Sequence, residues 1–292
     1  YPIENAMSGI PNLEQTRSIS RYGLSQVTII FKDGTDIYWA RQLINQRLQE
    51  AKSALPDSID PQMSPISTGL GEIYQWVVKA EPNAKKADGS AYSAMDLREI
   101  QDWIIRPQLQ RVQGVAEVNS IGGYNKTYVV SPDLTRLQQL QIPLTDLQDA
   151  LQNNNENRGA GFIEENGQQL TVRVPGMLTS IQDIQNVTVA TKNGLPIRVA
   201  DVASVSIGHD LRTGGATYNG QETVLGIAMM MMGENSKTIA KAIDQKVQEI
   251  QRSLPQGIVI ETVYDRSNLV DKAIKTVDKN LIEGARSEER RV

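Results

Sequence analysis

The sequence predicts an α+β fold built from split βαβ units, and three observations support this prediction. Short stretches with period-2 alternation of apolar residues, typical of strands, recur between longer stretches whose apolar residues are three or four apart, typical of helices. The order strand, helix, strand, strand, helix repeats, as in split βαβ domains. The chain has 292 residues, which is ample for about two domains of roughly 150 residues with buried cores.

Helix signals come from N-cap residues as well as from periodicity. Asp36 and Ser93 precede two long periodic stretches, and Ser236 and Ser267 precede the last two. Because the first helix starts at residue 1, further sequence is expected upstream. The predicted helices span residues 1–9, 36–54, 94–112, 134–140, 142–155, 181–185, 236–253 and 267–283.

Strand signals are separated by glycine-containing turns. Gly122-Gly123 is predicted to join two strands as a hairpin, and the Asn-Gly pairs at residues 166–167 and 193–194 predict two more hairpins. Residues 208–220 are polar and Gly-rich, which predicts an extended loop or arm. The predicted strands lie in residues 16–31, 72–79, 114–121, 124–130, 162–175, 187–191, 195–199, 202–207, 224–232 and 258–264.

Composition excludes several classes of protein. The chain has 30 Lys+Arg, 34 Asp+Glu and a net charge of −4, which argues against nucleic-acid binding. It has no Cys and a single His, His209, so a disulfide, a cysteine nucleophile and a multi-histidine metal site are excluded. No GxSxG, P-loop or HExxH motif occurs, and no enzymatic activity is expected. The longest uncharged apolar run, Leu225–Met232, is shorter than the roughly 18 residues of a membrane span.

A series of short segments carries a pattern shared with one known family. In chain order they are Tyr1–Pro11, Ser18–Ser25, Val27–Asp36, Arg98–Trp103, Gly114–Gly123, Gly233–Ser236 and Val263–Ser267. None is decisive alone, but together, in this order, they extend the resemblance over about residues 1–285. In this arrangement the chain resembles the first periplasmic loop of heavy-metal efflux pumps of the resistance-nodulation-division (RND) superfamily, CzcA/CusA type.

The resemblance implies ferredoxin-like split βαβ porter subdomains with an inserted α+β docking subdomain. The implied boundaries are 1–113 for the first porter subdomain (PN1), truncated at its N-terminus, 114–165 with 258–285 for the second (PN2), 166–257 for the docking subdomain (DN), and 286–292 for a tail outside the family. The tail has no apolar face and is interpreted as a cloning or reading-frame remnant. The segment 208–220 would be an arm that enters the neighbouring protomer of a trimer through His209, Asp210 and Arg212.

The resemblance also implies a function. The chain would be the periplasmic part of a proton-driven cation efflux pump anchored in the inner membrane of a Gram-negative bacterium. It would form part of the substrate cleft and dock an outer-membrane channel, with a membrane-fusion adaptor as a further partner, and it would not transport alone. No cofactor is expected; the transported ion would be Zn/Co/Cd, which is favoured, or Cu/Ag. A multidrug RND exporter, disfavoured by only 2 Phe, and a stand-alone periplasmic binding or adaptor module are the alternatives.

Two groups of residues are candidates for metal contact. Glu117, Glu164 and Glu165 lie in segments that border the cleft in this family, and their carboxylates suit borderline divalent ions. Asn119, Ile121 and Asn155 share that neighbourhood. The run Met229–Met232 offers soft thioethers, but alternate residues of a strand face opposite sides, so the four are expected to pack in a core of the docking subdomain. Asp265-Arg266 is expected to form a helix cap and a local ion pair.

Overall fold

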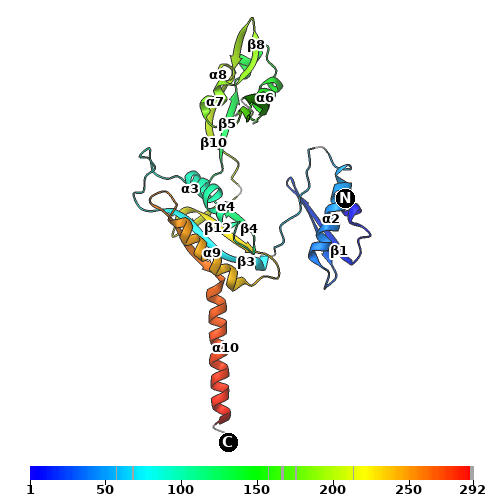
Figure 1. Ribbon diagram of the computed structural model, residues 1–292, viewed down its shortest axis with the longest axis vertical. Coiled ribbons are helices and arrows are strands. Elements are labelled where there is room, and N and C mark those ends of the chain that lie inside the picture. The colour runs from blue at the N-terminus through cyan, green and yellow to red at the C-terminus, as the bar shows by residue number, and fades with distance from the viewer. Residues whose placement is uncertain are drawn as a thin grey trace. The chain divides into compact units, whose positions relative to one another are not determined.

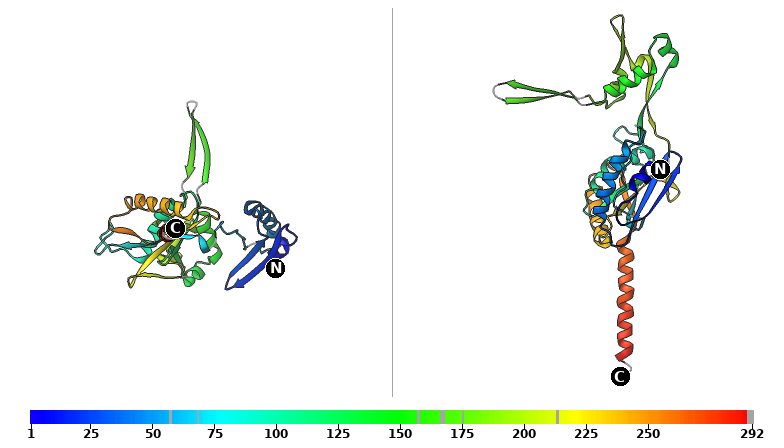
Figure 2. Two further views of the ribbon diagram at one scale, coloured as in Figure 1. Left: turned by 90° about the horizontal axis from the view of Figure 1, so that it is seen from below. Right: turned by 90° about the vertical axis from the view of Figure 1, so that its right-hand side faces the viewer.

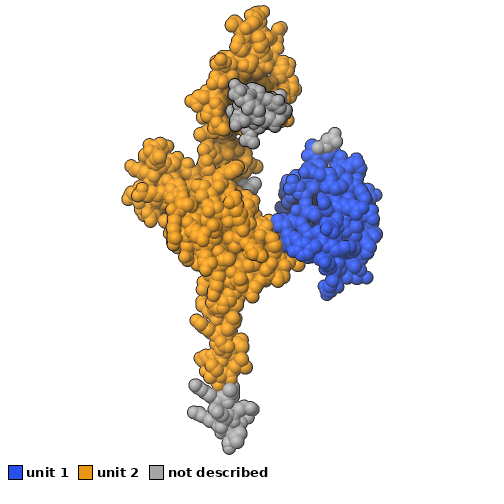
Figure 3. All heavy atoms as spheres, in the orientation of Figure 1, with its two compact units in different colours: residues 1–66 blue, residues 67–292 orange. Residues whose placement is uncertain are grey.

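The chain folds into two compact units, residues 1–66 and residues 67–292 (Figure 3). The computed structural model describes residues 1–56, 58–67, 69–156, 158–165, 168–174, 176–212 and 214–289. Helices alternate with small antiparallel sheets in both units, which confirms the predicted α+β class.

The first unit is a β-hairpin covered by two helices. Its elements are α1 (Pro2–Met7), β1 (Leu13–Arg21), β2 (Leu24–Phe31) and α2 (Ile37–Lys52). Asp36 caps α2 as predicted, because its carboxylate accepts the backbone N–H of Tyr38 at 2.7 Å. Met7, Ile10 and Leu48 form the buried centre of the unit.

The second unit is organised around a five-stranded antiparallel sheet, called the core sheet here (Figure 1). Its strands are β3 (Glu72–Ala80), β4 (Val115–Ile121), β11 (Ala216–Tyr218), β12 (Gln221–Met230) and β13 (Ile258–Asp265). The helical elements around it are a short 3₁₀ turn (Gly69–Gly71), α3 (Ala94–Ile100), a π-helical segment (Gln101–Ile105), α4 (Arg106–Leu109), α9 (Ser236–Gln251) and α10 (Arg266–Glu289). The spatial order β13-β3-β12-β4, with helices after β3 and after β12, is the ferredoxin-like split βαβ arrangement that was predicted.

One face of the core sheet is packed against α3, α4 and α9. The apolar side chains of these helices and of the sheet form one buried cluster that includes Trp76, Leu109 and Ile243. Trp76 donates its indole N–H to the Oε1 atom of the fully buried Gln101 at 2.9 Å. Gln101 in turn donates to the Ser120 hydroxyl at 3.2 Å, so the π-helical segment is tied to both β3 and β4. Buried polar groups satisfied in this way fix one orientation of the helices on the sheet.

An α+β insert, residues 122–215, lies between β4 and β12. Its elements are β5 (Lys126–Pro132), α5 (Leu134–Gln139), α6 (Leu144–Asn153), β6 (Arg158–Glu165), β7 (Gln168–Val174), α7 (Ile181–Asn186), β8 (Thr188–Lys192), β9 (Leu195–Arg198), α8 (Val199–Val202) and β10 (Ala203–His209). The insert has its own buried cluster, which includes Leu137, Leu147, Val199 and Val202. The β6–β7 hairpin forms a separate two-stranded sheet, seen as a long ribbon in Figure 2.

The strand grouping differs from the predicted subdomain boundaries. Strand β3, expected in a subdomain 1–113, pairs with β12 and β13, and β12 and α9, expected in a docking subdomain 166–257, belong to the core sheet and its helices. The observed insert, residues 122–215, therefore begins and ends about 40 residues before the predicted docking subdomain, residues 166–257. Strand pairing across an insert is a long-range choice that local periodicity does not encode.

The predicted hairpin at Gly122-Gly123 is wrong. Strand β4 pairs with β12 and the next strand, β5, pairs with β10, so the two strands belong to different sheets. Both glycines do have positive φ, 84° and 67°, as such a turn would require. The close packing explains the different path: a Cβ on Gly122 would lie 2.7 Å from the Thr223 carbonyl oxygen, and one on Gly123 would lie 2.7 Å from that of Ala94. The chain leaves the core sheet here.

Three smaller predictions also differ. The segment 208–220 is not one extended arm, since part of it continues β10 and Ala216–Tyr218 pairs with β12 as β11. Asn235 rather than Ser236 caps α9 by accepting the amide of Lys237. Asp265 accepts the amide of Ser267 at 2.8 Å, but Arg266 donates to the Leu70 carbonyl, so the expected local ion pair is replaced by a contact to the 3₁₀ turn.

The last helix, α10, has 24 residues. Within the part of the chain that the structure describes, no helix combines the length and the apolar character needed to cross a membrane. Residues 290–292 of the predicted tail lie outside the described residues.

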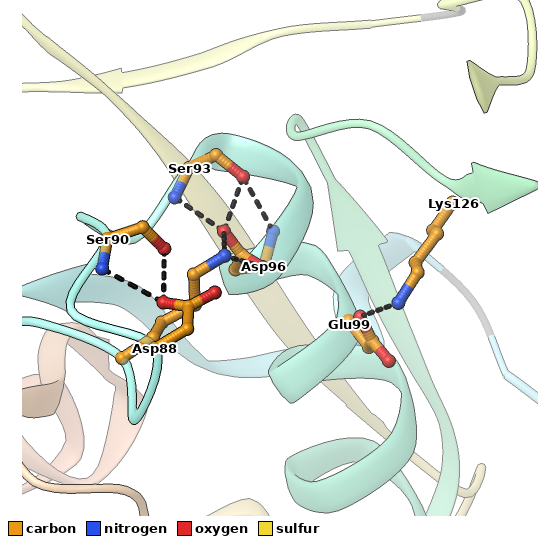
Figure 4. A network of polar contacts seen from close by, with 7 residues as sticks. Asp88, Ser90, Ser93, Asp96, Glu99 and Lys126 are labelled. Carbon is orange, nitrogen blue, oxygen red and sulfur yellow. Dashed lines mark hydrogen bonds and ion pairs between the residues drawn. The ribbon is translucent and has the colours of Figure 1, made fainter. Parts of the chain in front are cut away.

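The N-terminus of α3 is closed by a reciprocal capping box, drawn in Figure 4. The Ser93 backbone N–H and hydroxyl donate to Asp96 Oδ2 at 2.8 and 2.6 Å, and the Asp96 N–H donates to the Ser93 hydroxyl at 3.2 Å. Lys86 adds an ion pair at 3.1 Å. Burial raises the pKa of the Asp96 carboxyl, but the hydrogen bonds from Ser93 and the contact with Lys86 together outweigh burial, so the net effect lowers this pKa.

We expect Asp96→Asn to remove part of the acid sensitivity of the chain. The folded pKa of Asp96 lies below the unfolded value of about 4. Its ionised form therefore stabilises the fold fully above that unfolded value, and this stability is lost as the pH falls through the folded pKa. Urea unfolding followed between pH 7 and pH 3 measures the effect. If the free energy of unfolding fell by the same amount between pH 7 and pH 3 in Asp96→Asn as in the unchanged chain, the prediction would be contradicted. Ser93→Ala removes the Ser93 hydroxyl from both of its hydrogen bonds with Asp96, so it should cost about 1 kcal/mol at pH 7 and should also make the loss of stability in acid smaller.

Candidate functional site

The core sheet has a second face, opposite α3, α4 and α9, which we call the distal face. On β4, Ser120 points to the helices, because its hydroxyl donates to Asp102 at 2.6 Å. Alternation along a strand then places Glu117, Asn119 and Ile121 on the distal face. Register places Met229, Ile227 and Leu225 of β12 directly beside these three residues.

A row of polar and thioether side chains crosses the distal face. Met229 pairs with Glu117 on one side and with Glu72 of β3 on the other. The Asn119 Nδ2 atom donates to Glu117 Oε1 at 3.0 Å and lies 3.6 Å from the Met229 sulfur. Glu72 Oε2 accepts from the side-chain amide of Gln75 at 3.4 Å. We call Glu72, Met229, Glu117 and Asn119 the cation row, because two carboxylates, a thioether and an amide can all donate electron pairs to a cation.

One bulge brings Glu72 into this row, and a second bulge lies directly beyond the row. The β12–β3 register shifts between Ala228 and Met229, and the β12–β4 register shifts between Met229 and Met230. Each shift adds one residue to the partner strand, Ile73 on β3 and Ala116 on β4. A bulge re-aims the side chains beyond it. Without the shift on β3, Glu72 would follow the alternation of Tyr74 and Trp76 and would face the helices.

The methionine run divides as the alternation predicts. Met229 lies on the distal face, Met230 packs against the buried helix-side cluster, and Met232 is exposed. The four sulfurs therefore do not converge. The expected location in a docking subdomain is wrong, however, because β12 is a central strand of the core sheet. No sequence signal identifies Met229 and Glu72 as neighbours of Glu117, because their proximity depends on strand pairing.

A second polar group on the distal face is electrically balanced. Glu261 of β13 is ion-paired with Lys79 of β3, and the hydroxyl of Tyr218 donates to Glu261 at 2.6 Å. The contact with Lys79, followed by that with Tyr218, lowers the pKa of the Glu261 carboxyl, and Glu261 raises the pKa of Lys79. Glu117 and Glu72 instead contact neutral amides. Among these contacts, the carboxylates of Glu72 and Glu117 are therefore the ones on the distal face that have no cationic side chain as a partner.

The remaining predicted metal contacts are not brought to the cation row. Glu164 and Glu165 lie on β6 opposite Gln169 and Gln168, in a separate sheet from β4, and their side chains lie outside the described residues. Asn155 accepts the backbone N–H of Leu178 at 3.1 Å within the insert. Among the side chains that the structure describes, no group of three or more His, Asp or Glu could hold a metal ion without other ligand types. The cation row alone is an incomplete ligand set.

The predicted arm residues lie where the insert joins the core sheet. The Arg212 guanidinium forms an ion pair with Glu222 of β12 at 2.5 Å and lies 5.0 Å from the centre of the Tyr124 ring. The His209 ring also packs against Tyr124, with 4.7 Å between the two ring centres. Asp210 accepts the side-chain amide of Asn125 at 2.9 Å. The contacts that the structure gives for His209, Asp210 and Arg212 are thus made with residues of the same chain.

These features define a ferredoxin-like domain with an α+β insert and a carboxylate–thioether row on its distal face. A family model, described as the AcrB/AcrD/AcrF family, matches residues 1–286. The chain belongs to this family. The match ends close to residue 285, where the predicted resemblance also ends.

Among the relatives, the cobalt-zinc-cadmium resistance protein CzcA of Cupriavidus metallidurans is 61% identical over 285 residues, covering 98% of this chain and 27% of the relative. The cation efflux system protein CusA of Escherichia coli K12 is 35% identical over 285 residues, 97% of this chain and 27% of that protein. A crystal structure of a heavy metal efflux pump superposes with a TM-score of 0.83 at 29% identity, covering 97% of this chain and 27% of that chain. The predicted resemblance to CzcA/CusA-type RND pumps is confirmed, and the chain spans about a quarter of the length of these relatives.

Proposed function

We propose that the chain is the periplasmic porter and docking part of a proton-driven RND pump that exports heavy-metal cations. The observation that carries the proposal is the cation row, in a chain that is 61% identical over 285 residues to a cobalt-zinc-cadmium resistance protein. In this function the chain forms one wall of a cation path and acts as part of a transporter rather than as an enzyme. The parts of the pump beyond this chain supply the membrane helices and further ligands.

The cation row supports borderline divalent ions as substrates. Glu72 and Glu117 offer carboxylate oxygens, which suit Zn²⁺, Co²⁺ and Cd²⁺, and Met229 adds one soft sulfur. A single thioether is a poor basis for selective Cu⁺ or Ag⁺ binding, which favours several sulfur ligands. An incomplete set of weak ligands also suits transport, since a transported ion must be released. We therefore assign Zn/Co/Cd before Cu/Ag.

The insert is the candidate docking subdomain. Its own apolar core and its position between two strands of the porter sheet support this role better than the predicted range 166–257. The β6–β7 hairpin, which carries Glu164 and Glu165, is a better candidate for the inter-protomer arm than residues 208–220, because its strands pair only with each other. Its partners would be a second and third copy of the pump in a homotrimer. An outer-membrane channel and a membrane-fusion adaptor would contact the assembled periplasmic surface.

A chimeric pump tests this function. Residues 1–285 of this chain would replace the matching segment of the Cupriavidus metallidurans relative, and the host would be grown on cobalt, zinc, cadmium and silver salts. We expect resistance to cobalt, zinc and cadmium within about tenfold of that conferred by the parent pump. At 61% identity, the wall of the cation path that this chain forms should fit the remaining parts of the parent pump. A chimera that assembles in the membrane but confers resistance to none of these ions would contradict the proposal.

A further inference from the structure

A narrow stalk joins the two apolar cores of the second unit. The buried residues of the core sheet and those of the insert form separate clusters. Between them, residues 122–125 and 209–212 run side by side. The Asp210 N–H donates to the Asn125 carbonyl at 3.2 Å, directly before the β5–β10 pairing starts at Lys126 and His209. The insert is therefore attached by two adjacent backbone passages.

Polar contacts, rather than apolar packing, hold the root of this stalk. Arg212 binds Glu222 and donates to the Tyr124 hydroxyl at 3.1 Å. On the other side, Arg98 of α3 donates to the Gly122 carbonyl at 2.8 Å. A third contact, the ion pair of Glu99 with Lys126 at 3.2 Å, appears in Figure 4.

Open space surrounds these contacts. Two cavities, of about 230 and 480 Å³, lie at the root, and Arg98 lines both. Apolar side chains nearby are exposed rather than packed, including Leu211 at 91% and Trp103 at 77%. Ion pairs that remain accessible to water are weak, so the orientation of the insert can change without disrupting either core.

The two strands at the stalk root are the strands of the cation row. On β4, Glu117 lies four residues before Ile121, the last residue of the strand, and the chain then enters the stalk at Gly122. On β12, Glu222, which binds Arg212, lies near the start of the strand and Met229 lies near its end. They are paired in register from Leu225 to Met229. A tilt of the insert that pulls on Gly122 or Glu222 therefore acts along the same strand pair that sets the spacing of Glu117 and Met229.

We infer that the β4–β12 pair couples the orientation of the insert to cation binding at the row, and that Arg212 is the latch of this device. The coupling rests on the proposed function, whereas the latch does not. With Arg212 bound to Glu222 and Tyr124, the insert is held in one orientation and the row in one spacing. Release of Arg212 frees both. Coupling is reciprocal, so cation binding must also shift the orientation of the insert.

The experiment measures the orientation of the insert and the binding of Zn²⁺ at the cation row, both in the 292-residue chain. Because the chain has no Cys, nitroxide labels can be placed by Thr188→Cys in the insert and Gln245→Cys on α9, two exposed positions. Double electron–electron resonance gives the distance distribution between them, and calorimetric titration with Zn²⁺ gives the dissociation constant. Both are measured for the labelled parent, for Arg212→Ala and for Glu117→Gln. Arg47→Ala, which removes an exposed ion pair within the first unit, is the matched control.

We expect Arg212→Ala to broaden the distance distribution and to change the Zn²⁺ dissociation constant at least fivefold, with Arg47→Ala unchanged in both. Zn²⁺ should shift the distribution of the parent but not that of Glu117→Gln. A broadened distribution with an unchanged dissociation constant overturns the coupling, and an unchanged distribution in Arg212→Ala overturns the latch. Absence of Zn²⁺ binding in the parent overturns the cation row as a binding site of this chain, and the coupling with it. The chimeric pump tests the proposed function separately, and the distance distributions test the latch.

Discussion

Gly226→Ala is expected to destabilise the second unit by about 3 kcal/mol. A Cβ at this position of β12 would lie 2.2–2.5 Å from three atoms of the Trp76 indole. Trp76 is fully buried and hydrogen-bonded to Gln101, so the ring cannot move aside without losing that bond. Overpacking costs about 1–3 kcal/mol, and leaving a buried polar group unpaired adds a similar amount.

Hydrogen exchange of the core-sheet amides measures this loss, because the chain has several cores and need not unfold in one step. Gly214→Ala is the matched control, since its Cβ would meet only Ile121 at an ordinary 3.7 Å. Trp76→Leu combined with Gly226→Ala should lose less stability than the two single changes added together. Equal losses in Gly226→Ala and Gly214→Ala would show that the Trp76 ring does not restrict this position.

Glu117→Gln is expected to weaken Zn²⁺ and Co²⁺ binding at the cation row at least tenfold. The substitution keeps the shape of the side chain and its contact with Asn119 but removes the negative charge that faces a neutral amide. A tenfold change corresponds to about 1.4 kcal/mol. Titration of the chain with each ion gives the dissociation constants, and the chimeric pump gives the corresponding resistance.

Glu261→Gln is the control for this prediction, because the Glu261 charge is already balanced by Lys79 on the same distal face. It should change the dissociation constants less than twofold. Equal effects of Glu117→Gln and Glu261→Gln would indicate attraction by the general negative charge of the face rather than binding at the row.

Met229→Leu separates the soft from the hard part of the cation row. Leucine preserves the apolar volume but removes the sulfur near Asn119. We expect Cd²⁺ binding to weaken several-fold while Co²⁺ binding changes little, because thioethers favour softer ions. An equal loss for both ions would mean that Met229 supports the row by packing alone.

Local signals in the sequence predicted most helices and turns. The caps at Asp36 and Ser93 form hydrogen bonds within three residues, and the Asn193-Gly194 turn needs only the positive φ values that these residues adopt, 51° and 77°. Each depends on neighbouring residues alone. Gly122-Gly123 carries an equally clear local signal, and both residues have the positive φ values of a turn, but a turn does not specify which strand follows it into a sheet.

The candidate site was only partly accessible to sequence reasoning. Glu117 was selected through a resemblance to known pumps, whereas Glu72 and Met229 carried no signal that linked them to it. They meet because β12, after the insert, pairs between β3 and β4, and because a bulge on β3 turns Glu72 to the face of Met229 and Glu117. Such pairing is decided by the packing of whole strands against α3, α4 and α9.

The sequence by itself determined the α+β class, most helices and strands, several helix caps and the family, because these depend on periodicity, local hydrogen bonds and ordered motifs along the chain. Tertiary structure decided which strands share a sheet, where the insert begins, and which carboxylates lie beside the Met229 sulfur. The physical reason is that a strand satisfies its backbone hydrogen bonds equally well beside many partners, so the choice falls to the burial of side chains distant in sequence.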